Sequence, residues 1–322
     1  MNAKLVLGAA GAATVSLSLL AAASWEAYRT VFTRADSKLL APFARRQFDD
    51  SDFHVWRRAG AERLEKQKRQ LYTITSSRGE LLQGYYYPTT GEGKRIAFIV
   101  HGFRSNHAAA AGVLYDFYAA RGFDLFTVDN TACGASFGQH FGYDTYESED
   151  ALRWIDFLRD TFGEDVALIL HGFSLGASTV LKMSDRCGDN VKFIISDSAF
   201  RDGREQLKYQ LGPLFAPVRV INDIKAYDLR ETDVRPNLAR SQKPILFVHG
   251  LGDTVVPGRN GPNLMNDYHG PCDALFLPEI QHVETLYRAG EAYGKKVDAF
   301  IRKYVKATPH NTPAASSGKT AP

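Results

Sequence analysis

The pentapeptide Gly172-Phe173-Ser174-Leu175-Gly176 is the segment of this chain best suited to covalent chemistry. It follows the apolar run 166–170 and precedes a stretch of helix-forming residues. This context predicts a serine on a sharp turn between a buried strand and a helix. Glycines on both sides let the backbone crowd there without Cβ clashes, and the helix start directs N–H groups toward nearby negative charge. A serine held in this way is placed to attack a carbonyl carbon.

Three further apolar segments end in chemically useful residues. Residues 95–100 lead into His101-Gly102-Phe103, residues 244–248 lead into a loop that contains Asp253, and residues 274–277 precede His282. Ligands bind beyond the carboxyl ends of strands in open parallel sheets, so we expect these residues at one edge of the sheet. The chain order serine, aspartate, histidine differs from the order in the two common families of serine protease.

The elements that must position these residues alternate along the chain. Apolar segments flanking a Ser-Arg-Gly turn predict a β-hairpin at 71–87, and strand and helix patterns then alternate to residue 304. This alternation predicts an α/β protein with a mostly parallel sheet, helices on both faces and the hairpin as an antiparallel edge. The expected elements after the hairpin are strands at 95–100, 124–128, 166–170, 191–196, 244–248 and 274–277, and helices at 107–120, 146–161, 177–186 and 283–304.

The alternation is interrupted at residues 199–240, which are too long for a connecting helix and too apolar for a plain loop. We predict a small helical cap there, inserted in a catalytic domain that spans residues 71–306. Residues 307–322 are mostly Ala, Pro, Ser, Thr and Gly, which is typical of a disordered tail.

The N-terminus combines an apolar and a basic segment. Residues 5–24 carry no charge and just reach the length that spans a bilayer, so residues 1–24 are predicted to be a signal anchor, or a signal peptide cleaved near residue 23. The chain would then be membrane-anchored with its catalytic domain outside the cytoplasm, or secreted. Residues 25–70 form a basic helical neck that either rests on anionic lipid or packs on the catalytic domain.

Composition excludes several classes of function. The chain has 322 residues, 44% of them hydrophobic and 23% charged, as in ordinary globular proteins. Residues 29–70 hold eleven Lys and Arg against six acids, so residues 71–322 are mildly acidic, which argues against a nucleic-acid partner. The cysteines at 133, 187 and 272 have no metal-ligand spacing, and no glycine-rich dinucleotide loop is present. We therefore expect neither a metal nor a cofactor.

Taken together, these motifs resemble the α/β-hydrolase superfamily, most closely a group of bacterial membrane-anchored α/β-hydrolases. The resemblance covers about residues 70–305 and is strongest at 101–103, 171–177, 252–257 and 281–282. It implies an α/β-hydrolase fold of the serine hydrolase type. The chain departs from the family at residues 129–136, where an Arg-Gly-x-Gly-x-Ser sequence is usual, so the local shape near the site is expected to differ.

Within this resemblance, the candidate residues have defined roles. Ser174 would be the nucleophile, His282 would take its proton and return it to the leaving group, and Asp253 would orient the imidazole. The backbone N–H groups of Phe103 and Leu175 would bind the oxyanion.

Other residues compete for these roles. Asp197 follows the strand at 191–196 and is the rival acid, whereas His101, His171 and His249 precede glycines or end strands and are interpreted as structural. Candidates for the substrate pocket are His107, Phe173, Leu207 and Leu214, with ordinary core or cap packing as the alternative.

The sequence thus predicts a serine hydrolase that cleaves a small-molecule or lipid-like carboxylic ester through an acyl-enzyme. Two alternatives remain at this point. One is an amide or peptide hydrolase of the same fold, and the other is a non-catalytic binding protein that uses this fold.

Overall fold

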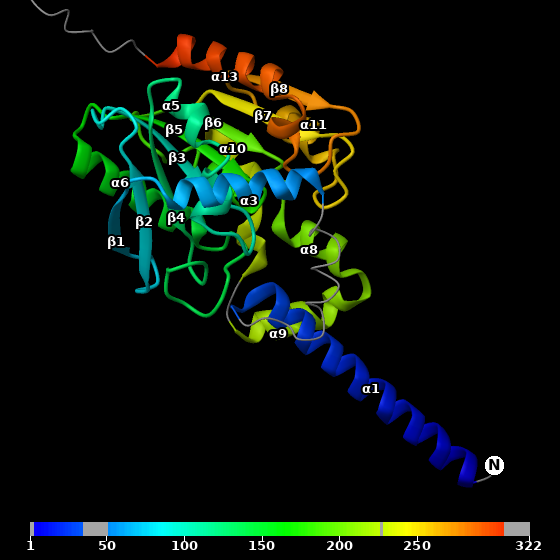
Figure 1. Ribbon diagram of the computed structural model, residues 1–322. Coiled ribbons are helices and arrows are strands. Elements are labelled where there is room, and N and C mark those ends of the chain that lie inside the picture. Colours follow the sequence, from blue (N-terminus) through cyan, green and yellow to red (C-terminus); the bar gives the residue numbers. More distant parts are fainter. Residues whose placement is uncertain (1–2, 35–50, 226–227, 306–322) are drawn as a thin grey trace, which may run out of the picture.

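An eight-stranded sheet forms the centre of the molecule, with strand order β1-β2-β4-β3-β5-β6-β7-β8 (Figure 1). The structure is a computed structural model that describes residues 3–34, 51–225 and 228–305, with side chains from residue 18 onward. β1 and β2 pair antiparallel and β2 also pairs antiparallel with β4, while every other pair is parallel. This confirms the predicted α/β architecture with an antiparallel edge.

The bounds of the elements are as follows. The strands are β1 Gln70–Thr75, β2 Leu81–Tyr87, β3 Arg95–Val100, β4 Asp124–Asp129, β5 Ala167–Phe173, β6 Val191–Asp197, β7 Ile245–Gly250 and β8 Cys272–Leu277. The helices are α1 Ala3–Phe32, α3 Asp52–Glu65, α4 His107–Ala111, α5 Tyr115–Ala119, α6 Glu147–Phe162, α7 Leu175–Lys182, α8 Gly203–Leu211, α9 Phe215–Ile224, α10 Arg235–Arg240, α11 Asn260–Asp267, α12 Thr285–Arg288 and α13 Gly290–Tyr304, with short 3-10 turns η1 Gly212–Leu214 and η2 Leu229–Thr232.

Helices cover both faces of the sheet because its parallel strands are apolar on both sides. In β3, Phe98 packs into the core under α6, α7, α10 and α11, whereas Ile99 points to the opposite core, formed with α3, α4, α5 and α13. The period of two in a strand thus divides one apolar run between two cores. Both cores leave the carboxyl ends of the strands free for loops.

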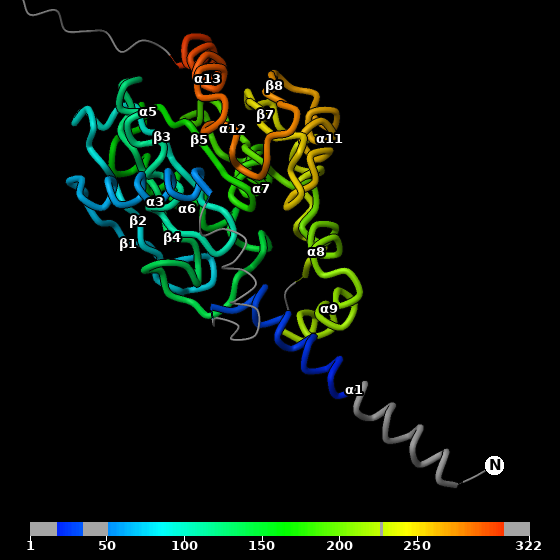
Figure 2. The backbone as a smooth tube through the Cα atoms, turned by 45° about the vertical axis from the view of Figure 1, so that its right-hand side comes forward, coloured from blue at the N-terminus to red at the C-terminus, as the bar shows by residue number. Residues whose placement is uncertain are grey.

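The cap consists of α8, η1 and α9 and lies between β6 and β7 in the sequence. The C-terminal part of α1 packs against α9, and the two views show α1 leaving the body of the protein beside the cap (Figures 1 and 2). Tyr28 and Phe32 of α1 are fully buried in one apolar cluster with Leu207 and Val218 of the cap. α10 lies in the predicted cap segment but packs on α7 and α11, so it belongs to the layer under the sheet.

Two helices predicted as continuous are broken. The segment expected to be one helix at 107–120 forms α4 and α5, separated around Gly112. The backbone of Gly112 lies so close to that of Gly60 on α3 that a Cβ atom there would stand 2.5 Å from the carbonyl carbon of Gly60. The segment 283–304 likewise forms α12 and α13.

The N-terminal helix is continuous through the boundary predicted at residue 24. No helix within the part of the chain that the structure describes meets the length and apolarity required to cross a membrane. The tail predicted at 307–322 and residues 35–50 of the neck lie outside the described residues.

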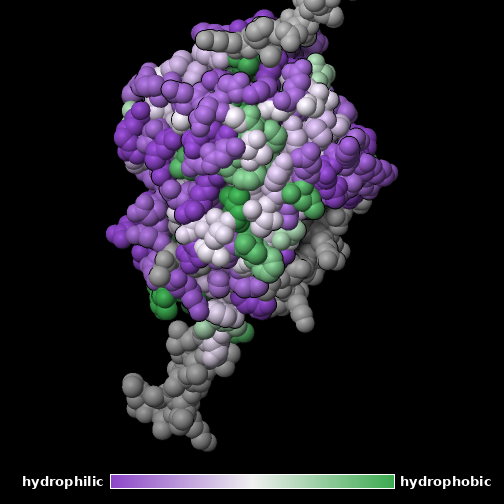
Figure 3. All heavy atoms as spheres, turned by 90° about the vertical axis from the view of Figure 1, so that its left-hand side faces the viewer, coloured by the Kyte–Doolittle hydropathy of each residue, from purple (hydrophilic) through white to green (hydrophobic). Residues whose placement is uncertain are grey.

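The face shown in Figure 3 is mostly hydrophilic, with a narrow strip of apolar side chains across it.

Candidate active site

Ser174 occupies the sharp turn between β5 and α7, with backbone angles φ 54° and ψ −119°. A left-handed φ in a residue other than glycine is costly and persists only where the surroundings fix it. The surroundings are tight here. A Cβ atom at Gly172 would lie 2.2 Å from the carbonyl oxygen of Gly176, and one at Gly176 would lie 2.3 Å from that of Val100. Gly172 therefore lets the turn close tightly, and Gly176 lets it lie directly against the end of β3.

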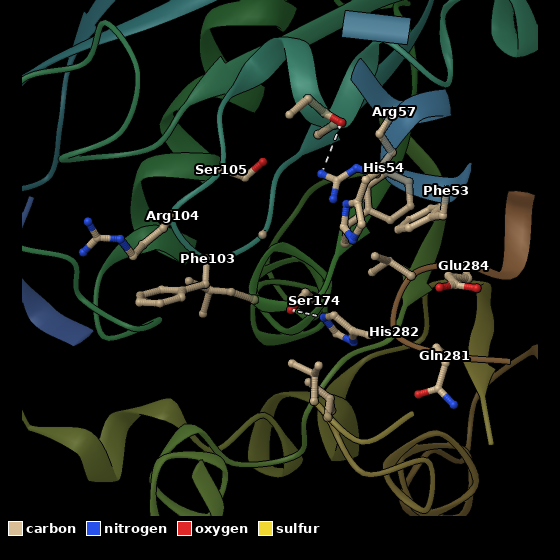
Figure 4. A pocket seen from close by; sticks show the side chains of 18 of the residues that line it. Phe53, His54, Arg57, Phe103, Arg104, Ser105, Ser174, Gln281, His282 and Glu284 are labelled. Carbon is tan, nitrogen blue, oxygen red and sulfur yellow. Dashed lines mark hydrogen bonds between the residues drawn. The ribbon is translucent and has the colours of Figure 1, made fainter. Parts of the chain in front are cut away.

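His282 lies within hydrogen-bond distance of this serine. Its Nε2 atom is 2.9 Å from Ser174 Oγ (Figure 4). Its Nδ1 atom is 2.6 Å from Asp253 Oδ2. A neutral imidazole with its proton on Nδ1 donates to the carboxylate and accepts from the hydroxyl. The structure thus brings together three residues that lie 29 and 108 positions apart along the chain.

The loop after β7 fixes the Asp253 carboxylate. Oδ1 accepts hydrogen bonds from the backbone N–H groups of Val255 at 2.8 Å and Val256 at 2.9 Å, which leaves Oδ2 for the histidine. Burial acts to raise the pKa of Asp253, but hydrogen bonds from His249 and His282 outweigh it and hold that pKa at about 2. The carboxylate is therefore ionised at neutral pH and can stabilise an imidazolium.

Asp197, the rival acid, has other partners. Its carboxylate accepts from Ser198 Oγ at 2.9 Å and from the hydroxyl of Tyr293 at 3.3 Å. It is fully buried, and burial raises its pKa to about 7. Asp197 also supports the site through its backbone, because its carbonyl accepts the N–H of Ser174 at 2.8 Å.

The other strand-end histidines are buried among polar partners. His101 Nδ1 lies 2.7 Å from the carbonyl oxygen of Gly102, and its Nε2 accepts the N–H of Asn130 at 3.0 Å. His171 stands between the hydroxyls of Tyr118 and Tyr293, each 2.9 Å away, and burial lowers its pKa to about 3. These two rings thus tie loops and helices to the sheet. His249 Nε2 lies 3.1 Å from the carbonyl oxygen of Val256.

Two backbone N–H groups near the serine donate no hydrogen bond within the described residues. They belong to Phe103, in the loop after β3, and to Leu175, the first residue of α7. The loop after β3 lies directly beside the serine, since a Cβ atom at Gly102 would stand 3.7 Å from Ser174 Oγ. Donors in this arrangement could stabilise negative charge that forms on the carbonyl oxygen when Ser174 Oγ bonds to the carbonyl carbon.

A pocket of about 750 Å³ opens over Ser174 and His282 (Figure 4). The cap and the loops after β3, β7 and β8 contribute to its wall, and α3 forms much of one side. Phe173 lines it, as the sequence predicted. No sequence pattern indicated that the neck contributes to the pocket, where its lining residues are Ser51, Phe53, His54, Trp56 and Arg57.

Three of the predicted pocket residues do not line this pocket. His107 is buried beside Asp129, which accepts its backbone N–H at 2.8 Å, and its ring stacks on Tyr85. Leu207 is buried in the cluster between cap and α1, and Leu214 packs against the same cluster. The expectation was wrong for the two leucines because the cap turns its apolar side chains toward α1, and wrong for His107 because its ring is buried between Tyr85 and Asp129.

The unusual loop at residues 129–136 folds around the Asp129 carboxylate. Besides His107, this buried group accepts the hydroxyl of Tyr85 at 2.9 Å and the N–H of Ala135 at 2.8 Å. Although burial acts to raise it, hydrogen bonds from His107 and Ala135 lower the pKa of Asp129 to about 2.

No group of His, Cys, Asp and Glu suited to a metal ion occurs among the described residues.

Comparison with known proteins agrees with this architecture. Residues 98–216 match the family model described as the alpha/beta hydrolase fold. Among relatives, the uncharacterized protein YqkD of Bacillus subtilis is 26% identical over 251 residues, which cover 74% of this chain and 81% of that protein. The uncharacterized protein YfhR of Escherichia coli K12 is 25% identical over a stretch that covers 71% of this chain and 78% of that protein.

Solved structures of similar fold include several esterases. An esterase of Pyrococcus furiosus, Pf2001, superimposes with a TM-score of 0.62 at 17% identity and covers 76% of this chain and 94% of its own. Acetyl xylan esterase 1 of a Thermoanaerobacterium species gives a TM-score of 0.56 at 16% identity, with 80% and 94% covered. Est1E of Butyrivibrio proteoclasticus, solved with ferulic acid, gives a TM-score of 0.58 at 19% identity and covers 72% of this chain and 99% of its own. At these identities the likeness establishes the fold.

Proposed function

Since the chain is an α/β-hydrolase by fold, we propose that it is a serine hydrolase that cleaves carboxylic esters through an acyl-enzyme. The observation that carries the proposal is the continuous hydrogen-bonded series from Asp253 through His282 to Ser174, at 2.6 and 2.9 Å. Several proteins of similar fold are esterases, which favours an ester over other substrates.

The first half of the reaction forms the acyl-enzyme. Ser174 Oγ attacks the ester carbonyl carbon while His282 Nε2 takes the hydroxyl proton, and the imidazolium is stabilised by Asp253. The carbonyl oxygen becomes an oxyanion and accepts hydrogen bonds from the N–H groups of Phe103 and Leu175. As the tetrahedral intermediate collapses, the carbon–oxygen bond to the alcohol breaks, and His282 gives its proton to the departing alkoxide.

The second half releases the acid. Water attacks the acyl-enzyme, loses a proton to His282 Nε2 and forms a second oxyanion in the same position. Collapse of that intermediate breaks the bond to Ser174 Oγ, which recovers the proton from the histidine. The free enzyme is restored with no change in its own protonation.

A fluorophosphonate probe tests this role directly. The full-length chain is expected to be labelled, whereas Ser174→Ala is not, and Ser77→Ala in the exposed hairpin turn serves as the matched control. Labelling that survives Ser174→Ala shows that another residue is the reactive nucleophile and contradicts the proposal. Absence of labelling from the wild type also contradicts it and favours a binding protein of this fold. Amide hydrolysis that far exceeds hydrolysis of 4-nitrophenyl esters would favour the amide alternative.

The location of the protein is part of the same proposal. We place the catalytic domain outside the cytoplasm, anchored by the uncharged N-terminal segment of the sequence. Protease added to intact cells should degrade the domain. A domain that is protected until the cells are lysed contradicts this location.

A further inference from the structure

Arg57 is a cation in the pocket wall that has no acidic partner among the residues that the structure describes. It projects from α3 into the pocket that contains Ser174, and its guanidinium donates one long hydrogen bond, 3.4 Å from Nη2 to the carbonyl oxygen of Ala109 (Figure 4). It forms no ion pair within the described part of the chain, and burial lowers its pKa. A guanidinium presents five N–H donors, so most of its donor capacity remains unused.

The other charged residues of the pocket wall are engaged elsewhere. Arg104 donates to the carbonyl oxygens of Thr30 and Thr33 on α1 at 2.8 and 2.9 Å. Glu284 is the one acidic residue among the described residues that line the pocket, and it pairs with Arg288 at 2.9 Å. Among the described residues of the lining, no acid therefore balances the positive charge of Arg57.

The helix that carries Arg57 is held firmly in place. The backbones of Gly60 on α3 and Gly112 beside α4 are in direct contact, and Leu64 is fully buried in the core on that face of the sheet. Phe53, also buried, packs against Trp56 and Tyr287. Because α3 is fixed in this way, the guanidinium is presented to the pocket without the entropic cost of ordering a mobile segment.

We infer that Arg57 forms an anion subsite, and that the ester hydrolysed at Ser174 carries a carboxylate or phosphate away from its scissile bond. A guanidinium binds either group through paired hydrogen bonds, and desolvating it without a partner is unfavourable. The inference rests on the proposed function, because it places the anion in the pocket of the reacting serine. His54, one turn before on α3, lines the same side of the pocket (Figure 4).

Matched pairs of esters test this subsite in the full-length chain. In the first pair, mono(4-nitrophenyl) suberate carries a carboxylate on the acyl part and 4-nitrophenyl octanoate does not. In the second pair, 4-carboxyphenyl octanoate carries a carboxylate on the alcohol part and phenyl octanoate does not. Arg57→Gln is expected to lower kcat/KM for the charged member of at least one pair roughly 10- to 100-fold relative to its neutral member. Arg57→Lys should retain part of the preference.

Hydrolysis of the neutral esters shows that each variant is folded. Arg63→Gln removes the same charge from an exposed position of α3 and should leave both ratios unchanged. The subsite is overturned if Arg57→Gln leaves the charged-to-neutral ratio of kcat/KM unchanged in both pairs while Ser174 still hydrolyses the neutral esters. The proposed function then stays intact.

A binding measurement decides the subsite even if the chain hydrolyses no ester. In the Ser174→Ala background, calorimetric titration with methyl hydrogen suberate and dimethyl suberate compares a charged with a neutral ligand of similar shape. Tighter binding of the charged ligand that Arg57→Gln abolishes supports the inference. Equal binding of both ligands contradicts it.

Discussion

Gly176→Ala tests whether the close contact between the serine turn and the end of β3 is required for activity. The backbone of Gly176 is helical, so alanine can adopt its conformation and the only new feature is the methyl group. That group would lie 2.3 Å from the carbonyl oxygen of Val100 and 2.6 Å from that of His101. Both atoms belong to the backbone, so no side chain can rotate away to accommodate it.

The size of the effect follows from this geometry. Ordinary contact begins near 3.4 Å, so the start of α7 must move from the end of β3 by about 1 Å. Overpacking of this kind destabilises a protein by about 1–3 kcal/mol. The same displacement separates Leu175 from Phe103, whose N–H groups we assign to the oxyanion, and a misplacement of about 1 Å can lower the rate about 100-fold.

The assay measures kcat on a 4-nitrophenyl ester and the free energy of unfolding in urea. Gly290→Ala is the matched control, because a Cβ atom at that exposed position meets nothing within 4 Å, and both quantities should stay near the wild-type values. Wild-type kcat in Gly176→Ala would refute the reasoning. A loss of stability with unchanged kcat would show that the turn shifts without disturbing the oxyanion donors.

Three further predictions follow from particular contacts. Asp253→Asn should lower kcat by about 10,000-fold, because the amide favours the wrong imidazole tautomer, whereas Asp197→Asn should keep kcat within a few-fold of wild type. Burial raises the pKa of Asp144 to about 7, above its value of 3.8 in the unfolded chain, so native stability falls as pH rises between these values. Asparagine tolerates the left-handed φ of 76° at this position. Asp144→Asn should therefore raise the free energy of unfolding in urea at pH 8 by up to about 4 kcal/mol and change it little at pH 4. Phe32→Ala removes a fully buried ring that packs on Tyr143 of the pocket wall, which should lower the free energy of unfolding by about 3–5 kcal/mol. It should also speed proteolysis within the cap and raise KM. Unchanged proteolysis would show that α1 does not hold the cap in place.

The strands were predictable because their signals are local. The run at 95–100 forms β3 with the predicted bounds, and β5, which precedes Ser174, begins one residue after its predicted start. Parallel strands buried on both faces read as unbroken apolar runs, and their carboxyl ends necessarily share one edge of the sheet. The edge at which Ser174, Asp253 and His282 meet could therefore be derived from the order of elements.

Helix continuity could not be derived in the same way. Most of residues 107–120 are compatible with a helix, but α4 ends at Ala111, next to the point where the backbone of Gly112 contacts that of Gly60 on α3, more than forty residues earlier. A sequence pattern reports the preference of a segment for helix. It does not report which distant backbone will lie against it.

Sequence alone thus determined the class of fold, the turn that carries Ser174 and the order of the residues around it, since each depends on local periodicity and on the direction of parallel strands. Tertiary packing decided which side chains face the substrate. The neck became a pocket wall that presents Arg57, and the apolar cap residues became a contact with α1. An apolar residue gains similar free energy from any buried environment, so its type predicts burial but not the surface against which it is buried.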